Sequence, residues 1–423
     1  MKDFKEFKFR PDVEAGIEAA GYSSPTPIQA EAIPTVMKGG DVMGLAQTGT
    51  GKTAAFGLPI LNSLAAGGRG VIRALIVAPT RELAEQIHES IETLGKKTGL
   101  KSVTVYGGVN INPQINKLKR GVDIVVACPG RLLDHIGQGT IDLSKLAVLV
   151  LDEADHMFDM GFLPDIRRIL KSIPAKRQTL LFSATMPSEI KKLAHDILDN
   201  PVTIQVDNTA AAVTVSHALY PVAQHLKTKL LMELLRHTDT ESVLVFTRTK
   251  HRAKRLGEQL EKAGYTAASL QGNLSQNRRQ AALNGFRDGT YQILVATDIA
   301  ARGIDVSQIS HVINYDIPDT PEAYVHRIGR TGRAAKTGDA FTMVSNEDRQ
   351  MVSIIERKLG RPLERITIEG FEYDAPAPAK NNEFARPPRE PNRGGRPQSQ
   401  AGNKSGTPSG GSKSRFRGQR RSG

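Results

Sequence analysis

The sequence predicts an α/β protein of two tandem domains, each a parallel sheet flanked by helices, followed by a disordered basic tail. Short apolar runs alternate with helix-like stretches along most of the 423 residues. The runs are continuously apolar, which is typical of parallel strands covered on both faces. From about residue 374 onward, Pro, Gly, Ser, Asn and Arg dominate. Such a segment cannot bury enough apolar surface to order itself.

The apolar runs are the predicted strands. They include residues 74–78, 102–106, 123–127, 146–151 and 179–182 in the first half, and 242–246, 292–296, 311–315 and 340–344 in the second. Their alternation with helices implies βαβ units. We expect an N-terminal domain at residues 1–207, a linker at 208–219, a C-terminal domain at 220–370 and the tail at 371–423.

Residues 46–53 read Ala-Gln-Thr-Gly-Thr-Gly-Lys-Thr, which is typical of a phosphate-binding loop. Its glycines let backbone N–H groups turn toward phosphate oxygens, and the following helix would present its N-terminus to them. Lys52 would neutralise the β- and γ-phosphates, and the Thr53 hydroxyl would bind Mg²⁺. The pattern usually opens with Gly, so Ala46 departs from it, and a surface turn is the alternative for such a loop alone. The nucleotide-binding residues expected here are Ala46, Gln47, Thr48, Gly49, Thr50, Gly51, Lys52 and Thr53.

An acidic tetrapeptide, Asp-Glu-Ala-Asp at residues 152–155, directly follows the apolar run 146–151. Ligands of open α/β sheets bind at this carboxyl edge of the strands. Asp152 would hold Mg²⁺ directly or through water, and Glu153 would orient or deprotonate the attacking water. A solvated acidic turn is the alternative, but the phosphate loop upstream argues against it. Together the two motifs predict a protein that binds and hydrolyses a nucleoside triphosphate.

The charge balance predicts a polyanionic partner. The chain carries 57 Lys and Arg against 44 Asp and Glu, a net charge of +13. Residues 375–423 hold 11 basic and 2 acidic side chains, so this segment carries +9 of the total. It is expected to be an electrostatic arm for nucleic acid, with a solubilising tail or linker as the alternative.

The same composition argues against secretion and membrane insertion. The single cysteine, Cys128, cannot form an internal disulfide and suits a reducing compartment. No apolar stretch approaches the roughly 20 residues needed to span a bilayer. We therefore expect a soluble cytoplasmic protein.

Further motifs follow in a fixed order. They are residues 21–29, 79–84, 107–108, 129–131, 183–185, 271–272 with Gln276 and Arg279, 296–305 and 326–333. With the phosphate loop and the acidic tetrapeptide, this series resembles the DEAD-box ATP-dependent RNA helicases over about residues 4–345. The short N-terminus and the Arg/Gly-rich tail are most similar to the bacterial RhlE-type group. The resemblance implies that each domain is RecA-like.

The resemblance also implies roles around ATP. Gln29 would read the adenine edge through two hydrogen bonds, which leaves guanine mispaired. Phe4 would stack on the adenine, although it could instead anchor the N-terminal segment in the core. Asp305 would meet the ribose. The arginines Arg330 and Arg333 would reach the γ-phosphate from the second domain and act in catalysis with Lys52, Asp152 and Glu153.

Four residues would couple the ATP site to RNA. Asp155 would be linked to Ser183 and Thr185, for which strand-end capping is the alternative. His326 would help to position the segment that carries the arginines.

For RNA, the family places backbone amides and hydroxyls against phosphates and 2′-OH groups, and such contacts sense RNA without reading its sequence. The residues implied are Thr80, Arg81, Gly108, Gly130, Arg131, Gly272, Arg279 and Thr297.

Two positions depart from the family pattern. Cys128 stands where Thr is usual before Pro-Gly-Arg, and a thiol is a much weaker hydrogen-bond donor than a hydroxyl. Gln271 stands where many members have His. A catalytic thiol is not expected, because the motif supplies Cys128 with no basic partner.

The implied protein is an RNA-stimulated ATPase that locally separates short RNA duplexes or remodels RNA–protein complexes, in ribosome assembly or RNA decay. It would use ATP and Mg²⁺, act as a monomer, and meet ribosomal or RNA-decay proteins. The alternative is an ATP-gated RNA clamp or annealing chaperone in which the tail dominates RNA binding. A DNA helicase is a third, less favoured interpretation.

Overall fold

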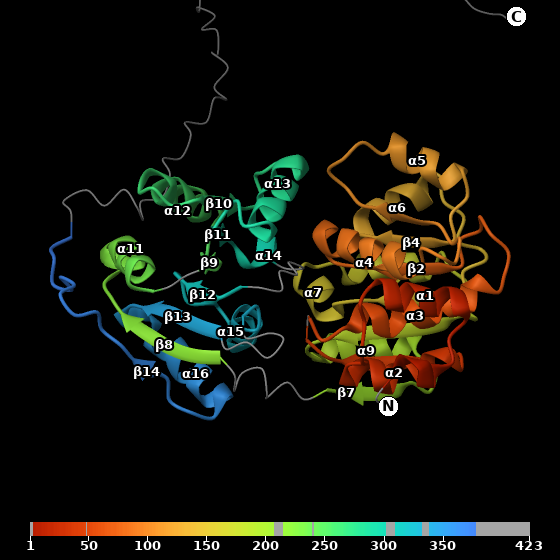
Figure 1. Cartoon of the computed structure of the whole chain (residues 1–423), viewed down its shortest axis with the longest axis horizontal. Helices are drawn as coiled ribbons and strands as arrows, with labels where there is room; N and C mark the ends of the chain where they lie inside the picture. Colours follow the sequence, from red (N-terminus) through yellow and green to blue (C-terminus); the bar gives the residue numbers. More distant parts are fainter. Residues whose placement is uncertain are drawn as a thin grey trace, which may run out of the picture. The chain divides into compact units, whose positions relative to one another are not determined.

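A computed structural model describes residues 3–47, 49–206, 215–238, 241–301, 309–331 and 338–377. Within them the chain forms two parallel sheets, each of seven strands and each with its own helices (Figure 1). The structural likeness reported below confirms the predicted fold class. No helix in the described part of the chain is long and apolar enough to cross a membrane.

The first sheet has the strand order β3-β4-β2-β5-β6-β1-β7, and all of its pairs are parallel. Its strands are β1 (Val42–Leu45), β2 (Ala74–Val77), β3 (Ser102–Val105), β4 (Ile124–Ala127), β5 (Val148–Leu151), β6 (Gln178–Ser183) and β7 (Val202–Gln205). Its helices are η1 (Phe4–Phe7), α1 (Pro11–Ala19), α2 (Pro27–Met37), α3 (Lys52–Ala65), α4 (Arg81–Leu94), α5 (Asn112–Lys119), α6 (Pro129–Gly137), α7 (Ala154–Asp159), α8 (Leu163–Leu170) and α9 (Ser188–Ile197).

The second sheet repeats the design with the order β10-β11-β9-β12-β13-β8-β14, again all parallel. Its strands are β8 (Val215–Pro221), β9 (Val243–Phe246), β10 (Ala267–Leu270), β11 (Ile293–Ala296), β12 (His311–Asn314), β13 (Gly338–Val344) and β14 (Glu364–Arg365). Its helices are η2 (Gln224–Leu226), α11 (Lys227–His237), α12 (Lys250–Lys262), α13 (Gln276–Arg287), α14 (Asp298–Ala301), α15 (Pro321–Ile328), η3 (Asn346–Asp348) and α16 (Arg349–Leu359).

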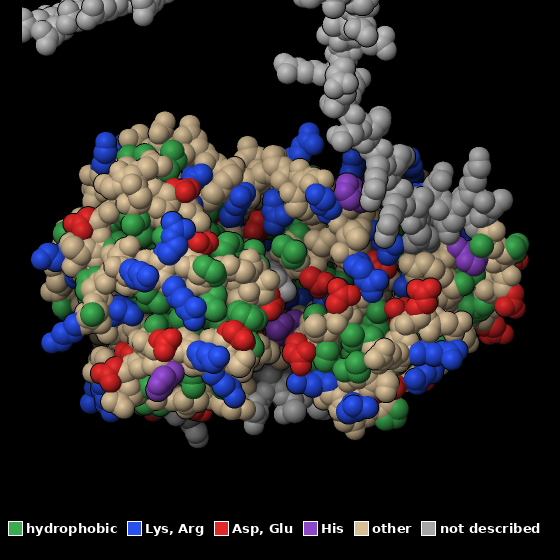
Figure 2. Space-filling model, turned by 180° about the vertical axis from the view of Figure 1, so that it is seen from behind, with side chains coloured by type: hydrophobic (Ala, Val, Ile, Leu, Met, Phe, Trp, Pro, Cys, Tyr) green, Lys and Arg blue, Asp and Glu red, His purple; other side chains and the backbone are tan. Residues whose placement is uncertain are grey.

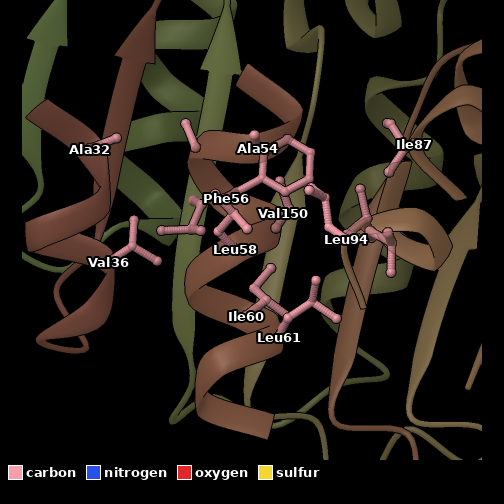
Figure 3. Packing of buried hydrophobic residues seen from close by; sticks show 14 of the residues in the cluster. Ala32, Val36, Ala54, Phe56, Leu58, Ile60, Leu61, Ile87, Leu94 and Val150 are labelled. Carbon is pink, nitrogen blue, oxygen red and sulfur yellow. The ribbon is translucent and has the colours of Figure 1, made fainter. Parts of the chain in front are cut away.

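Burial on both faces explains why the strands are continuously apolar. In β5, Val148 and Val150 pack into the cluster that α1 to α4 cover, whereas Leu149 and Leu151 pack into the cluster that α6 to α9 cover. Successive side chains of a strand point to opposite faces, so both sets must be apolar. Figure 3 shows one of these faces, where Phe56 of α3 packs toward the sheet near Val150.

Every apolar run predicted as a strand coincides with one, but the domain boundaries differ from the prediction. Strand β8 begins at Val215, so residues 215–219 belong to the second sheet and not to the linker. Residues 208–214 lie outside the described part. The second domain also extends past residue 370, because Phe371, Tyr373 and Ala375 pack against its core. The compact unit of the chain runs to Pro376.

Phe182 should be a sensitive position for the stability of the first domain. Its ring lies in the core, 5.5 Å from that of Phe56, over Gly44 of the neighbouring strand. Phe182→Ala would leave a cavity and lower the free energy of unfolding by about 3–5 kcal/mol, as measured by urea denaturation. Phe182→Leu fills most of the space and should cost clearly less. Equal losses in the two variants would contradict this packing.

Candidate nucleotide site and nucleic-acid interface

The predicted phosphate loop joins β1 to α3 with the backbone that its glycines allow. Gly49 and Gly51 have φ values of 85° and 91°, in the left-handed region. Gly51 precedes the first residue of α3, and a Cβ there would clash with the Gln29 amide. Thr50 donates from its hydroxyl to the Gln47 carbonyl over 2.8 Å. Thr48 lies outside the described residues. The loop thus presents the N-terminus of a 14-residue helix, which suits an anion.

The surroundings of the Lys52 ammonium suit the binding of a phosphate. Its Nζ is buried and has no hydrogen-bond partner among the described residues. The Asp152 carboxylate is 3.6 Å away, which makes an ion pair but not a hydrogen bond. Burial raises the pKa of the Asp152 carboxyl above its ordinary value, although Lys52 opposes this rise. A buried ammonium without hydrogen bonds is costly, and phosphate oxygens would remove that cost.

The residues present also suit magnesium bound together with phosphates. No cluster of three or more His, Cys, Asp or Glu side chains poised to bind a metal occurs in the described part. Magnesium does not need one, because it is usually held by one or two carboxylates, substrate phosphates and water. Asp152, whose carboxylate is almost fully buried beside Lys52, and Thr53 in the first turn of α3 fit this pattern.

Gln29 is tied to the phosphate loop. Its Oε1 accepts from the Thr26 backbone N–H over 3.0 Å, and its Nε2 donates to the Gly51 carbonyl over 3.1 Å. Thr26 in turn donates from its hydroxyl to the Thr50 carbonyl over 2.8 Å. An amide has two N–H groups and two lone pairs, so these bonds leave capacity for an adenine edge. The segment expected to recognise the base and the loop expected to hold the phosphates therefore form one hydrogen-bonded unit.

Phe4 lies in an aromatic cluster. It is 4% exposed, and its ring centroid is 6.0 Å from those of Phe7 and Tyr22. This packing matches the alternative considered for Phe4, an anchor of the N-terminal segment. Its stacking on adenine stays a prediction.

Glu153 combines an unusual backbone with a specific side-chain partner. Its φ and ψ are 52° and 53°, which is uncommon for a residue other than glycine. The His156 Nδ1 lies 2.8 Å from Glu153 Oε2, and both side chains are buried. Burial favours the protonated form of Glu153. The contact with His156, helped by the charges of Lys52 and Arg330, outweighs burial and holds the pKa of the Glu153 carboxyl well below its ordinary value.

The three first-domain residues predicted to couple the sites do meet. Asp155 Oδ2 accepts from the backbone N–H and the hydroxyl of Thr185, each over 2.9 Å. The Asp155 N–H donates to Ser183 Oγ over 3.1 Å, and that hydroxyl donates to the Thr185 carbonyl over 2.7 Å. The strand end of β6 is thereby joined to α7. Whether this network transmits RNA binding stays a prediction.

The end of α15 lies against the first-domain site. The His326 ring meets the His156 ring edge-on, with centroids 5.4 Å apart, and burial lowers the pKa of His326 to about 4. A Cβ on Gly329 would lie 3.4 Å from Gln47 Oε1 in the phosphate loop. Arg330 is 5% exposed, and its charge contributes to the low pKa of Glu153. Arg333 and Asp305 lie outside the described residues.

Arg327 was missed by the sequence reasoning. Its Nε and Nη2 donate to the two carboxylate oxygens of Asp298, each over 2.6 Å. Its Nη1 donates to Asn314 Oδ1 over 3.0 Å and to the Asp316 carbonyl over 2.7 Å. This buried guanidinium fixes α15 to β12 and α14, and so places the following Arg330. The motif showed an arginine here, but its partners lie 11 to 29 residues away in sequence.

Most of the predicted RNA-binding residues line one cavity of about 530 Å³. They are Thr80, Arg81, Gly130, Arg131, Gly272, Arg279 and Thr297. Gly108 is not in the lining, but a Cβ there would clash with the Arg81 guanidinium. Sequence reasoning missed Arg248, Lys250, Phe162 and the 64% exposed Ile299, which share the lining. The cavity thus combines cations with apolar surface, as expected for contact with single-stranded nucleic acid.

A polar cluster links the two domains beside this cavity. The Glu82 carboxylate accepts from Arg279 Nε over 2.8 Å and from Gln276 Nε2 over 3.4 Å. Arg81 Nη1 donates to Gln276 Oε1 over 3.0 Å. Two of the predicted RNA-binding arginines are therefore engaged with protein groups, and Glu82, which the sequence did not single out, organises them.

Both departures from the family pattern are buried. Cys128 precedes α6 and forms no side-chain cap, and burial raises the pKa of its thiol to about 12. The thiol therefore stays protonated and is no nucleophile. Gln271 is buried as well, and its Oε1 accepts from the Asn273 N–H over 2.6 Å.

Known proteins are similar to this chain over most of its length. Residues 26–193 match the DEAD/DEAH box helicase family, and residues 226–335 match the helicase conserved C-terminal domain. The chain is 44% identical over 364 residues to the DEAD-box ATP-dependent RNA helicase CshA of Bacillus licheniformis, across 86% of this chain and 74% of that protein. CshA of Geobacillus kaustophilus is 45% identical over 367 residues, across 86% and 78%.

Solved structures agree with these relatives. S. cerevisiae Dbp5 bound to RNA and ADP BeF3 has a TM-score of 0.79 and 30% identity, across 86% of this chain and 96% of that one. A DEAD box protein from Methanococcus jannaschii has a TM-score of 0.52 and 36% identity, across 87% and 99%. Two RecA-like domains are thereby confirmed. The relatives named here are CshA proteins, so the predicted RhlE-type grouping is not confirmed.

His326 should make the stability of the protein depend on pH. Its pKa is about 4 in the folded chain and near 6.5 when unfolded, so between these values only the unfolded chain takes up the proton. Stability should therefore fall as the pH falls from 6.5 to 4. His326→Gln should reduce this loss, as measured by urea denaturation at several pH values. His251→Gln, on the exposed face of α12, should leave it unchanged. The same pH dependence with and without His326 would contradict the assignment.

Proposed function

The chain belongs to the DEAD/DEAH box helicases, and from its two sites we propose that it uses ATP to separate short RNA duplexes locally. The relatives support the coarser statement directly: the protein is a DEAD-box ATP-dependent RNA helicase with RNA-stimulated ATPase activity. Local strand separation, or remodelling of RNA–protein complexes, is the finer proposal.

One observation carries this proposal: both candidate sites draw side chains from both domains. At the nucleotide site, His326 meets His156, and the Arg330 charge acts on Glu153. At the RNA cavity, Arg81 and Arg279 come from different sheets. A ligand that contacts both domains stabilises the arrangement in which they meet. ATP and RNA would therefore favour the same arrangement and each other's binding, because coupling of this kind is reciprocal.

Hydrolysis would take place where the first-domain acids face the second-domain arginines. Lys52 would bind the β- and γ-phosphates, and the ionised Glu153 would accept a hydrogen bond from the attacking water and orient it. Arg330, together with the predicted Arg333, would stabilise the charge that develops on the γ-phosphoryl group. Asp152 and Thr53 would hold Mg²⁺, which neutralises phosphate charge. Asp305 is proposed to contact the ribose.

RNA would be held by its backbone. The lining of the cavity offers Thr80, Arg81, Arg131, Arg279 and Thr297, whose groups suit phosphates and 2′-OH groups. A single strand gripped by both domains would bend as they meet, and its partner strand would be released. The network of Asp155, Ser183 and Thr185 is proposed to couple the binding of RNA to the ATP site.

The alternative function gives the tail the leading role, as in an RNA clamp or annealing chaperone. It is favoured by the concentration of charge: residues 375–423 carry +9 of the net +13. On the face drawn in Figure 2, Lys and Arg are interspersed with Asp and Glu and do not merge into one continuous patch. The RhlE-type grouping, a role in ribosome assembly or RNA decay, and a monomeric state stay predictions.

Glu153→Gln tests the catalytic proposal. The amide is similar in size but cannot act as a base, so ATP and RNA binding should persist while turnover falls about 100-fold or more. Binding is measured with a fluorescent ATP analogue and a labelled RNA, and turnover by phosphate release. Glu258→Gln, exposed on α12, is the matched control and should hydrolyse ATP normally. Near-normal hydrolysis by Glu153→Gln would remove Glu153 from the proposed role.

Truncation after Pro376 tests the role of the tail. The cut must not fall earlier, because Phe371 and Tyr373 pack on the second domain. We expect RNA-stimulated ATPase and duplex separation to persist at low salt, with RNA binding that depends less steeply on salt, because fewer cations are released. A full-length variant with its 11 tail Lys and Arg replaced by Gln separates charge from length. Loss of duplex separation with intact ATPase would favour the alternative function.

A further inference from the structure

The side chain of Glu153 has an unusual position for a residue that begins a helix. It is the N-cap residue of α7, where the backbone is usually extended, yet its backbone is left-handed and its side chain forms no cap. Its left-handed backbone turns the carboxyl instead toward His156, three residues further on. A backbone of this kind is unfavourable for a residue other than glycine and persists where the surroundings fix it. The contact with His156 is therefore a built feature of the site.

The His156 ring is held from several directions. Its Nδ1 faces Glu153 Oε2, and its edge contact with His326 restrains the ring plane. The His156 backbone N–H donates to Asp155 Oδ1 over 3.1 Å, which fixes the start of the side chain. The ring is buried, about 6% exposed, so water does not compete for these contacts. A ring restrained in this way can restrain its partner.

The direction of the hydrogen bond follows from the carboxylate. An ionised carboxylate can only accept a hydrogen bond, so the bond across the 2.8 Å between His156 Nδ1 and Glu153 Oε2 runs from an Nδ1–H to the carboxylate. An ionised carboxylate has about four lone-pair sites on two oxygens. One of these sites, on Oε2, accepts from His156.

We propose that His156 is a positioning residue that orients the Glu153 carboxylate toward the attacking water. The residue lies outside the acidic tetrapeptide and touches no atom that reacts; it acts through Glu153. Because its ring also contacts His326, the orientation of Glu153 depends on the presence of α15, the helix that precedes Arg330. This inference rests on the proposed role of Glu153.

Two amide variants test the proposal with matched chemistry. In His156→Asn the side-chain nitrogen lies near the position of Nδ1, whereas in His156→Gln it lies near that of Nε2. Asn can therefore restore the bond to Glu153, and Gln cannot in the same rotamer. We expect His156→Gln to lower the kcat of RNA-stimulated ATP hydrolysis roughly 10- to 100-fold, the scale of a misplaced reacting group, with KM for ATP within about threefold. His156→Asn should retain kcat within about threefold of the native value.

Several outcomes decide the matter. If both variants keep full kcat, or if both lose it equally while melting at the native temperature, the proposal is overturned. A parallel rise in KM for ATP would also overturn it, because that result points to a disturbed binding site. If one amide variant fails to fold, His156→Ala takes its place, and binding of an ATP analogue checks that it is folded. Its kcat should fall as much as we expect for His156→Gln. An active Glu153→Gln would instead defeat the proposed function itself.

Discussion

Parallel pairing is the constraint on which both sites depend. In a parallel sheet all strands end at one edge, so the segments that follow β1, β2, β4, β5 and β6 meet there whatever their distance in sequence. The phosphate loop, the acidic tetrapeptide and Ser183 are neighbours for this reason. The second sheet repeats the arrangement, and Thr297 follows its strand β11 in the same way, whereas Arg330 follows the helix α15. The helices that cover both faces make the pairing stable, but the strand directions position the chemistry.

The nucleotide site is also a site of concentrated, buried charge. Lys52, Asp152, Glu153, His156 and Arg330 are all largely withdrawn from water. Such groups are tolerated only when they compensate one another, and removal of one partner from a buried pair commonly costs about 3–5 kcal/mol. The compensation is incomplete, because the Lys52 ammonium has an ion-pair partner but no hydrogen bond within the described chain. The protein thus keeps one strong donor in reserve for its substrate, at a cost in its own stability.

The sequence allowed the architecture and most of the site to be predicted, because both depend on local patterns. The nine apolar runs coincide with strands. Motif residues such as Asp152, Ser183 and Thr297 lie at or just after strand ends, whereas Gln29, Arg279 and His326 lie in helices. The predicted runs did not include β1, β7, β8, β10 or β14. In β1, Gly44 makes room for Phe182, and in β8, Ser216 and His217 interrupt the apolar pattern. Glu82, His156 and Arg327 could not be recognised for a different reason. Their importance comes from partners that only the fold brings near, and a single sequence does not show those distances.

The packing of Phe182 over Gly44 has a mechanical consequence. The two residues face each other across the pairing of β1 with β6, in a position with no room for a side chain on the glycine. The Phe182 ring therefore hinders the strand that leads into the phosphate loop from sliding along the strand that leads to Ser183. We therefore expect a conformational change of this domain to occur in its connecting turns, such as the short turn at Glu153, and not by sliding within the sheet.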